Sequence, residues 1–575
     1  MRFVLAIISF IVAATMVGFG IAQRTILAQP DKVTLSASVE SDATVTVIDG
    51  ATLNSFDGSQ TLTVSGPGQV FAAYGRTSDV LAWIGDTTYT AVSRDAESGE
   101  LVSETVPGAE TEVPDPNGSD LWLDDYVKDG ELTLTVNVPE DISFIIASDG
   151  VEPAPSDIAV AWPIDNSTPW AGPLIVGGAL VLLLGIGFLL WATHHMRSTR
   201  GPRRKMPKVP KKPVYKPVRK PVEATASGRR RGMIAVPVVL VGALTLAGCS
   251  PDFWPGGSAG PTPEPSASVP AGAELSPPAV TVHQVERIVA KISAVVAEAD
   301  EARDGALLET RFDGPALELR LTNYTIRGND PAQPGLPAIP EGPVKLTLPQ
   351  QTASWPRTVF AVIQDDKDAT IPPVALMLVQ EDPRSDYKVT YAITLEASAV
   401  LPDVAPASVG AARLPADTGL LAMTPTEVVE AYGEILMKDV ESTSYLAFEA
   451  EGDTLRQSVG LAAKNDLKAS LPTTATMSFT NGVGPGPAIA LSTNDAGAIV
   501  AVNLLEATTV APVEAGAAVN PTGQVKALSG ITVTQKGVVA TYSDQLLFYV
   551  PPAGSNAKIV LLGYSTGLIT ATEIG

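Results

Sequence analysis

The stretch from Trp170 to Cys249 constrains this chain most, because it holds two apolar runs separated by a cationic segment. No residue from Pro173 to Trp191 is charged, and about 19 apolar residues are enough for a helix to cross a hydrocarbon core of about 30 Å. Tryptophan favours lipid–water interfaces, so Trp170 and Trp191 are expected to mark the two ends of the span. The sequence predicts a transmembrane helix over residues 170–192; the alternative is a buried core helix.

A basic segment over residues 193–232 decides the predicted topology. It holds fourteen Lys and Arg residues and one acid, a charge of +13 in a chain that carries −23 overall. Cationic loops beside a spanning helix stay on the cytoplasmic side. We therefore expect a cytosolic segment, with residues 24–169 on the outer face. The cations nearest the helix are expected to lie at the membrane interface, and they include Arg203, Arg204 and Lys205.

Prolines recur every three or four residues between those cations, at Pro207, Pro210, Pro213, Pro217 and Pro221. Proline at this density favours an extended polyproline II conformation. The segment is predicted to be a solvated tether that lies against anionic membrane lipids. A nucleic-acid tail or a partner-docking strip is the alternative, but Tyr215 is the only aromatic residue there. The acidic pI of about 4.6 also argues against a nucleic-acid-binding chain.

A second apolar run over residues 233–249 follows Arg229, Arg230 and Arg231. A positive region, an apolar region and a small-residue exit are typical of an export signal. Its end, Leu246-Ala247-Gly248-Cys249, resembles the lipobox of bacterial lipoproteins. The resemblance implies diacylglyceryl transfer to the thiol of Cys249, and cleavage before it by a signal peptidase that recognises Leu246, Ala247 and Gly248. Cys249 is the only cysteine in the chain.

The position of this signal departs from the lipoprotein pattern, because two apolar segments precede it. The chain looks like a lipoprotein precursor fused behind a two-helix membrane protein, and its richness in Ala, Gly, Val and Pro resembles that of actinobacterial proteins. Acylation at Cys249, an uncleaved third membrane helix and a soluble core segment remain the alternatives. The first two place the C-terminal half outside.

The first apolar run, Phe3 to Ala22, occupies the predicted N-terminal segment 1–23. Such a run is either a cleaved signal peptide or a membrane anchor. It is longer than the usual apolar region of a signal, and the exit at Gly20 to Gln23 is a mediocre cleavage site. We expect an uncleaved anchor.

Residues 24–169 are predicted to form an all-β extracytoplasmic domain. Glu131 to Val138 alternates apolar and polar residues, as a strand with one buried face does. Thr44 to Ile48 runs into Asp49-Gly50, a hairpin turn signal. Further short strands are expected at Thr61–Val64, Val70–Tyr74 and Val80–Ile84. Asp115 to Asp120 is similar to a calcium loop but lacks its glycine and closing glutamate, which predicts a plain surface turn.

Residues 250–280 are rich in Pro, Gly, Ser and Ala and are expected to be a spacer. Beyond it, residues 281–422 and 423–575 are predicted to be two copies of one α+β module. Thr281 to Gln284 and Thr424 to Glu427 are capping-box patterns that open amphipathic helices. Gly314 and Gly452 occupy corresponding positions in the two copies.

Strands are expected after each helical part of these modules. They are Thr358–Gln364, Val374–Gln380 and Tyr387–Leu395 in the first copy, and Ala475–Thr480, Ala498–Leu505, Gly537–Tyr542, Leu546–Val550 and Lys558–Leu562 in the second. A helix followed by an antiparallel sheet resembles the cystatin-like or NTF2-like fold. That resemblance implies a concave sheet around a helix, used as a pocket or a protein-docking face.

No catalytic, cofactor-binding or metal-ligating constellation is predicted. Gly563 to Gly567 matches the G-x-S-x-G motif of α/β-hydrolases, which needs a histidine after its serine. All three histidines, His194, His195 and His283, precede Ser565. The adjacent pair His194-His195 is expected at the membrane interface. It is not expected to bind zinc, because a structural zinc site needs four ligands and no cysteine or third histidine is nearby.

These patterns favour a non-enzymatic, membrane-anchored protein of the cell envelope with a binding or scaffold role. The expected partners are membrane lipids and an unidentified envelope protein or glycan. One alternative is an accessory subunit of a membrane secretion or transport complex. The other is a pocket enzyme in a C-terminal module that uses carboxylates such as Asp365, Asp366 or Glu381.

Overall fold

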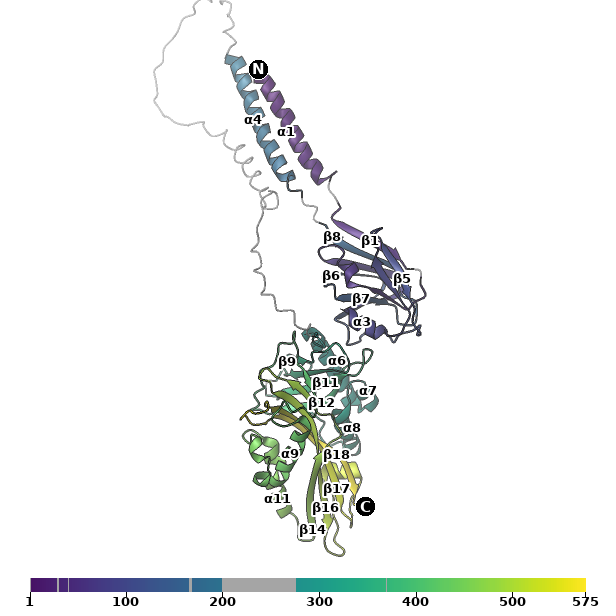
Figure 1. The fold of residues 1–575 in the computed structure, drawn as a ribbon, viewed down its shortest axis with the longest axis vertical. Helices are drawn as coiled ribbons and strands as arrows, with labels where there is room; N and C mark the ends of the chain where they lie inside the picture. The colour runs from purple at the N-terminus through teal and green to yellow at the C-terminus, as the bar shows by residue number, and fades with distance from the viewer. Residues whose placement is uncertain (1, 28–29, 40, 165–167, 199–275, 369) are drawn as a thin grey trace, which may run out of the picture. The chain divides into compact units, whose positions relative to one another are not determined.

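The computed structural model describes residues 2–27, 30–39, 41–164, 168–198, 276–368 and 370–575 (Figure 1). The basic segment and the second apolar run, including Arg203 to Lys205 and Leu246 to Cys249, lie outside the described residues. The chain divides into two compact units. The first comprises residues 1–34 and 161–270, and the second comprises residues 35–160 and 271–575.

Two long apolar helices form the first unit, α1 (Arg2–Arg24) and α4 (Ala171–Ser198). They lie side by side and run antiparallel (Figure 1). Within the described residues, both are long and apolar enough to cross a membrane. Trp170 precedes the first turn of α4, Trp191 lies near its last turns, and both side chains are exposed. The two predicted apolar segments are thus helices of membrane-spanning length.

Small residues line the contact between these two helices. On each helix they recur every seven residues, at Ala6, Ala13 and Gly20 of α1 and at Ala171, Gly178, Gly185 and Ala192 of α4. A seven-residue repeat keeps one stripe facing a supercoiled partner, and small side chains let the two backbones approach closely. A Cβ atom on Gly178 would lie 3.1 Å from the Val17 backbone nitrogen. Large apolar side chains such as Leu184 and Leu190 point outward, as lipid-facing residues do.

Cysteine cross-linking tests this helix pair. A Cβ on Gly185 would lie 3.2 Å from the Ser9 Cβ, close to the Cβ separation of a disulfide. In a Cys249→Ser background, Ser9→Cys with Gly185→Cys should form a disulfide in most molecules on oxidation in membranes. The matched control replaces Gly187, which has no atom within 4 Å of its Cβ position, and should stay uncoupled. A non-reducing gel after cleavage at a protease site inserted near residue 166 scores the result. Equal coupling of the two pairs would contradict the packing.

The N-terminal part of the second unit, here called the β domain, is built on an eight-stranded sheet. The strand order is β1-β8-β3-β7-β2-β4-β5, with β6 paired to β3. The strands are β1 (Lys32–Ser38), β2 (Val45–Ile48), β3 (Gln60–Arg76), β4 (Tyr89–Arg94), β5 (Leu101–Val106), β6 (Asp124–Val136), β7 (Ile142–Ala147) and β8 (Asp157–Pro163). The alternation predicted from Glu131 is confirmed, because Leu132 and Leu134 are buried while Thr133 and Thr135 are exposed.

Two short helices correct the all-β prediction. Val80 to Ile84 belongs to α3 (Thr77–Ile84), whose buried Val80, Trp83 and Ile84 follow helical spacing. Asp49-Gly50 is not a hairpin turn. Asp49 is the N-cap of α2 (Gly50–Leu53), and its carboxylate accepts a hydrogen bond from the Thr52 N–H at 2.7 Å.

One long strand replaces two predicted short ones. Thr61–Val64 and Val70–Tyr74 both belong to β3, whose register against β6 shifts between Ser65 and Gln69. Gly66, Pro67 and Gly68 occupy the shift, as expected where a bulge interrupts a ladder. The turn residues therefore bend one strand and do not end it.

The C-terminal part of the second unit, here called the barrel, is a mixed helix and sheet fold with one nearly barrel-shaped sheet. We call its residues 281–422 the first repeat and its residues 423–575 the second repeat, after the modules predicted from the sequence. The first repeat comprises α6 (Val282–Ala302), α7 (Gly305–Glu309), α8 (Gly314–Asn329), β9 (Val344–Pro349), β10 (Arg357–Ile363), β11 (Val374–Gln380) and β12 (Lys388–Leu395). After β13 (Arg413–Leu414), the second comprises α9 (Pro425–Lys438), α10 (Thr454–Val459), α11 (Leu461–Ala469), β14 (Ala475–Val483), β15 (Ile489–Ser492), β16 (Ala498–Pro512), α12 (Gly523–Ser529), β17 (Val538–Val550) and β18 (Val560–Glu573). Both predicted capping boxes are formed, at Thr281 with Gln284 and at Thr424 with Glu427.

The two repeats share one sheet of ten strands. Its order is β13-β15-β16-β17-β18-β12-β11-β10-β9, with β14 paired to β16. The last strands of the repeats, β12 and β18, pair antiparallel, with Thr394 opposite Tyr564. Antiparallel pairing of equivalent strands is what a two-fold axis between the repeats would produce. A further bridge between Gln350 and Ala411 joins the β9 edge to the segment leading into β13, so the sheet nearly closes into a barrel with few free edges.

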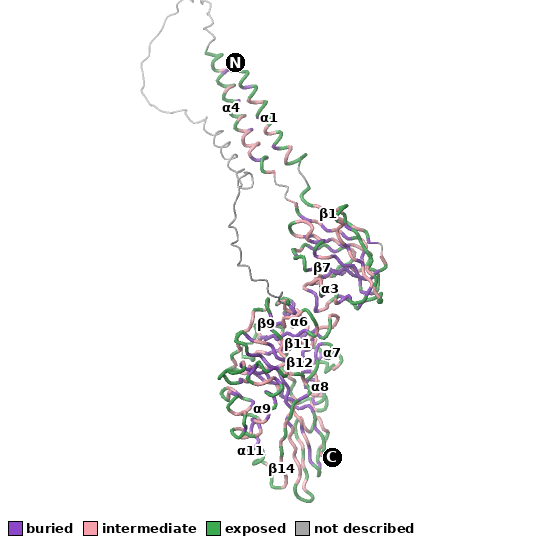
Figure 2. Tube along the Cα trace, in the orientation of Figure 1, coloured by how far each residue is buried: buried purple, intermediate pink, exposed green. Residues whose placement is uncertain are grey.

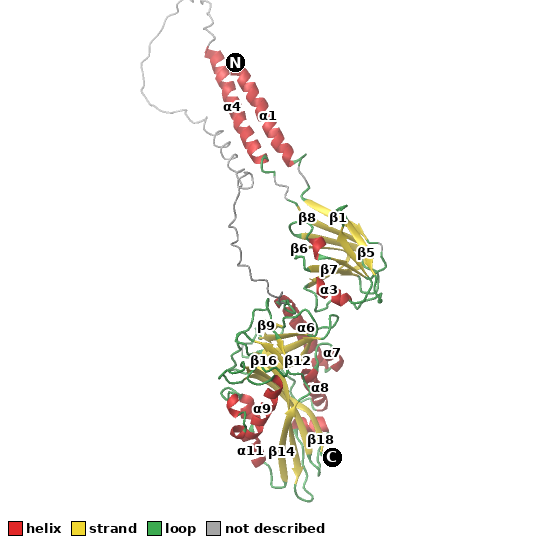
Figure 3. Cartoon of the chain, viewed as in Figure 1, coloured by secondary structure: helices red, strands yellow, loops and turns green. Residues whose placement is uncertain are grey.

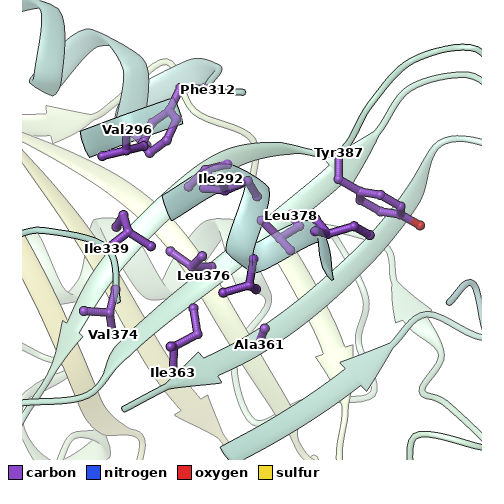
Figure 4. Packing of buried hydrophobic residues seen from close by; sticks show 14 of the residues in the cluster. Ile292, Val296, Phe312, Ile339, Ala361, Ile363, Val374, Leu376, Leu378 and Tyr387 are labelled. Atoms are coloured by element: carbon purple, nitrogen blue, oxygen red, sulfur yellow. The ribbon is translucent and has the colours of Figure 1, made fainter. Parts of the chain in front are cut away.

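The three largest of the barrel's hydrophobic clusters hold its helices and strands together. Helix α6 covers one outer face, where Ile292 and Val296 pack with Leu376 and Leu378 of β11 (Figure 4). Helix α9 covers the corresponding outer face of the second repeat. The inner faces pack on each other through residues such as Phe360, Met377, Tyr391, Ile499 and Leu547. Buried positions therefore follow the strands, as Figure 2 shows, and the repeats form one folded body.

Candidate functional site

The most extensive set of buried polar contacts lies where the β domain meets the barrel, within the second unit. The charges there are divided between the two sides. Most of the cations are barrel residues, Arg287, Lys291, Arg311, Arg357 and Arg384, and most of the carboxylates are β-domain residues, Asp79, Glu110, Asp120, Asp124 and Asp125. The β-domain cation Arg76 also lies there, 3.6 Å from Asp79, and donates to the Pro278 carbonyl of the barrel. Complementary surfaces of this kind select one partner orientation. We call this surface the charged interface.

Arg357 and Asp79 form the deepest contact of the charged interface. Arg357 is the first residue of β10 and is 1% exposed, and Asp79 lies in the first turn of α3. The guanidinium donates Nη2–H to Asp79 Oδ1 at 2.6 Å and Nη1–H to Oδ2 at 3.0 Å. It also lies 3.8 Å from the ring centroid of Trp355. A two-point arginine–carboxylate pair fixes both distance and orientation.

Asp120 of the β domain is the centre of a second group of ion pairs in the charged interface, and its side chain is fully buried. Its carboxylate accepts from the Arg311 guanidinium, from the Tyr387 backbone N–H at 3.1 Å and from Lys291 Nζ at 3.3 Å. The other side of Arg311 reaches Asp386 at 3.1 Å. Burial raises the pKa of Asp386, the charge of Asp120 raises it further, and Arg311 opposes both.

The sequence prediction for Asp115 to Asp120 is wrong at its end, because the plain surface turn ends in this buried anion. Asp115 does close a local turn, accepting from the Asn117 N–H at 2.9 Å. Within the described ranges, no group of three His, Cys, Asp or Glu side chains is placed to hold a metal ion.

Backbone carbonyls of the β domain are also contacted. Arg384 donates to the carbonyl oxygens of Trp83 at 2.8 Å and Ile84 at 2.7 Å, at the C-terminal end of α3, where helix carbonyls lack intrahelical partners. A cation at that end also suits the helix dipole. Arg287 donates to the Trp122 carbonyl at 2.6 Å and to Asp124 at 3.1 Å.

Aromatic rings complete the charged interface. The ring centroids of Trp83 and Trp122 lie 5.3 Å apart within the buried core of the β domain. Trp355 of the barrel packs against this same core, and its indole N–H donates to Gln380 at 3.0 Å. Low-dielectric surroundings strengthen the ion pairs and make any unpaired member costly. The arrangement therefore joins the β domain firmly to the barrel.

Substitution of Asp79 tests the central ion pair. Asp79→Asn leaves the Arg357 charge buried without its counter-ion, so we expect a loss of about 3 kcal/mol or more in unfolding free energy. Asp86→Asn, an exposed carboxylate seven residues on, should change it by less than about 0.5 kcal/mol. Denaturant unfolding followed by tryptophan fluorescence measures both, because Trp83 and Trp355 adjoin the pair.

A double variant separates charge burial from general damage. Asp79→Leu with Arg357→Met removes both charges, and it should be more stable than Asp79→Leu alone, which leaves the Arg357 guanidinium buried without its counter-ion. Arg76, 3.6 Å from Asp79, loses the same partner in both variants and so does not affect the comparison. If the double variant lost as much stability as the sum of the single ones, the pair would not be coupled as described.

The carboxylates considered for catalysis lie in turns. Asp365 and Asp366 follow β10, and the Asp365 carboxylate accepts from the backbone N–H groups of Lys367 and Asp368 at 2.7 and 3.2 Å. Asp366 and Glu381 are exposed. Together they form no convergent cluster.

The hydrolase-like motif and the three histidines lie in different elements of the fold, in β18, α6 and α4. Gly563 to Gly567 lies inside β18, and Ser565 Oγ accepts from the Thr394 N–H at 3.2 Å, so the serine is not on a strand-to-helix turn. His283 lies exposed in the first turn of α6, 3.9 Å from Glu286. His194 and His195 lie in the last turns of α4.

Sequence reasoning missed the charged interface, although one signal was present. Arg357 is the first residue of β10, and the mainly apolar run Thr358 to Ile363 follows it. All seven residues of this strand are buried. A buried arginine needs an anionic partner. The partner, Asp79, is 278 positions away, and no local pattern points to it.

The comparison with family models bears on the barrel. A family described as a domain of unknown function, DUF8094, matches residues 276–573. The chain belongs to the DUF8094 family. The match spans α6 to β18, so the DUF8094 region contains both repeats and supplies the five barrel cations of the charged interface. The opposing carboxylates of the β domain lie outside the DUF8094 match. No curated protein and no solved structure matches the chain.

Proposed function

We propose that the chain is a non-enzymatic, membrane-anchored protein of the bacterial cell envelope whose β domain and DUF8094 barrel act together on the extracytoplasmic face as a binding or scaffold body. The observation that supports this most is the charged interface. It requires residues 35–160 and 276–575 to share one compartment, because ion pairs such as Arg357–Asp79 join them directly.

Shared location constrains how the chain crosses the membrane. Helix α4 lies between the two parts in sequence, and a helix that spans the bilayer places its ends on opposite faces. The chain must then cross once more between residues 198 and 276. In that interval the sequence offers one apolar run, residues 233–249, whose path lies outside the described residues. Either a lipid-modified Cys249 or a third membrane helix would complete the crossing.

The sidedness of the proposal follows from charge. Residues 193–232 carry +13, and such a segment is retained in the cytosol, while the acidic remainder is exported. The close pairing of α1 with α4 supports an uncleaved N-terminal anchor, because α1 supplies half of the small-residue contact. Membrane lipids are then one partner, and an envelope protein or glycan would bind the exported body.

Two alternatives remain from the sequence. An accessory subunit of a secretion or transport complex would use the same topology. A pocket enzyme based on Asp365, Asp366 or Glu381 is disfavoured by their places in surface turns.

Site-specific proteolysis tests the proposal. A protease site is inserted near Asp57 in the β domain, near Val400 in the barrel, or near Thr225 in the basic segment; Asp57 and Val400 lie in exposed loops. Protease added to intact protoplasts should cut the first two and spare the third, which should be cut only after lysis. The third site is the matched control for membrane integrity. Cleavage of one outer site without the other, or protection of both, would contradict the proposal.

A further inference from the structure

A cavity of about 490 Å³ lies in the second repeat, between α10, α11 and the sheet. Figure 3 shows α11 beside the strands there. Its apolar lining comes from Val459, Leu467, Met477, Phe479 and Tyr542. Ligand cavities of 300–1,000 Å³ lined mainly by apolar and aromatic side chains, with a few polar groups, are the usual form of a small-molecule site.

Three charged side chains converge on this cavity, and two of them neutralise each other. Lys464 of α11 donates to Glu506 of β16 at 2.7 Å, and both side chains are nearly buried. Lys464 also donates to the Val459 carbonyl, and its Nζ lies 5.6 Å from the Phe479 ring centroid. The pair is thus satisfied within the protein.

Asp544 is the third charged residue and is not satisfied in this way. It lies in β17 on the face that α9 and α11 cover, in line with the buried Leu546 and Phe548. It is 1% exposed, and its Oδ2 atom has no hydrogen-bond partner among the described residues. Thr566 hydrogen-bonds the same carboxyl, so one of its two oxygens is left without a donor. A buried oxygen of this kind costs stability unless a donor meets it, and its position in a cavity wall points to a ligand that brings one.

The charges select the class of that donor. Among the residues that line the cavity, Lys464 and Glu506 are paired, so the net charge of the lining is that of Asp544. Lys468 lies outside the lining, with its Nζ 5.4 Å from the ring centroid of Phe479. When Asp544 is ionised, the lining therefore repels an anionic ligand and attracts a cation. An ammonium group donates to a carboxylate more strongly than a neutral hydroxyl does. The side chains of Met477 and Leu467 and the part of the Phe479 ring not covered by Lys464 and Lys468 suit an apolar body.

We propose that this cavity is a binding site for a small amine with an apolar body, whose ammonium group pairs with Asp544 while the body packs on Met477, Phe479 and Leu467. The inference deepens the proposed binding role by naming a ligand class. It is tested on the purified full-length chain, so its failure is distinguishable from a failure of the membrane topology.

The protonation of Asp544 makes the binding depend on pH. Burial raises the pKa of Asp544 to about 7; Glu506 also raises it, and Thr566 and Lys464 lower it. Tyr542 of the same strand lines the cavity, and Tyr432 of α9 also faces this carboxyl. Below pH 7 the ammonium must displace a proton from Asp544, so affinity should rise about tenfold between pH 6 and pH 8, while an alkylamine stays protonated throughout.

The experiment measures binding of 2-phenylethylamine, 2-phenylethanol and 3-phenylpropanoate by calorimetry to the full chain in detergent. The amine should bind most tightly and the carboxylate least. Asp544→Asn should weaken amine binding at least tenfold at pH 8 and remove its pH dependence, with little effect on the alcohol. Glu514→Gln, an exposed acid outside the cavity, is the matched control and should change nothing.

The folding of Asp544→Asn is checked separately. A carboxyl with a raised pKa stabilises the fold fully below its unfolded value and loses that contribution as pH rises to about 7. The variant should therefore melt at a higher temperature than the natural chain, by a margin that grows from pH 4 to pH 7 and then stays constant. Absence of amine binding, equal binding of amine and alcohol, or unchanged amine affinity in Asp544→Asn would overturn the assignment.

Discussion

The buried ion pair between Arg357 and Asp79 is the contact on which the rest of the account depends. Arg357 lies at the start of the buried barrel strand β10, and its guanidinium lies 3.8 Å from the ring centroid of Trp355, which packs against the β-domain core. Asp79 lies in α3 of the β domain, and Trp83 of the same helix packs against Trp122 in that domain's core. Neither charge is stable in its buried position without the other. The pair therefore links the two folds, which the long apolar helix α4 separates in the sequence.

That link gives the barrel a defined role. Two repeats pair their last strands, close most of the sheet and bury their inner faces against each other, which leaves few free edges for unwanted pairing. The first repeat supplies most of the cations of the charged interface, and the second contains the cavity with Asp544. The first repeat thus joins the barrel to the β domain, and the cavity lies in the second repeat.

Local sequence signals predicted local structure well. The capping boxes at Thr281 and Thr424 and the alternation at Glu131 each depend on residues within a few positions, and each is formed as expected. Val80 to Ile84 shows the limit, because a short apolar run fits a strand or a buried helix equally well. The residues form a helix, in which Trp83 packs into the core of the β domain.

Long-range features could not be predicted from such signals. Asp120 looks like a turn residue in sequence, and only Arg311, 191 positions away, makes it a buried anchor. The joining of β12 to β18 and the unsatisfied oxygen of Asp544 are likewise properties of the folded chain. The two helices of membrane-spanning length were predictable because the prediction needs only the length and apolarity of a segment.

Cleavage of the connecting segment tests the central claim most directly. A protease site placed between residues 250 and 275 of the full chain is cut after purification in detergent, and the product is run on size-exclusion chromatography. The account predicts that the C-terminal piece co-elutes with the β domain at physiological salt, because the ion pairs are buried and weakly screened. Separate elution of the two pieces would contradict it.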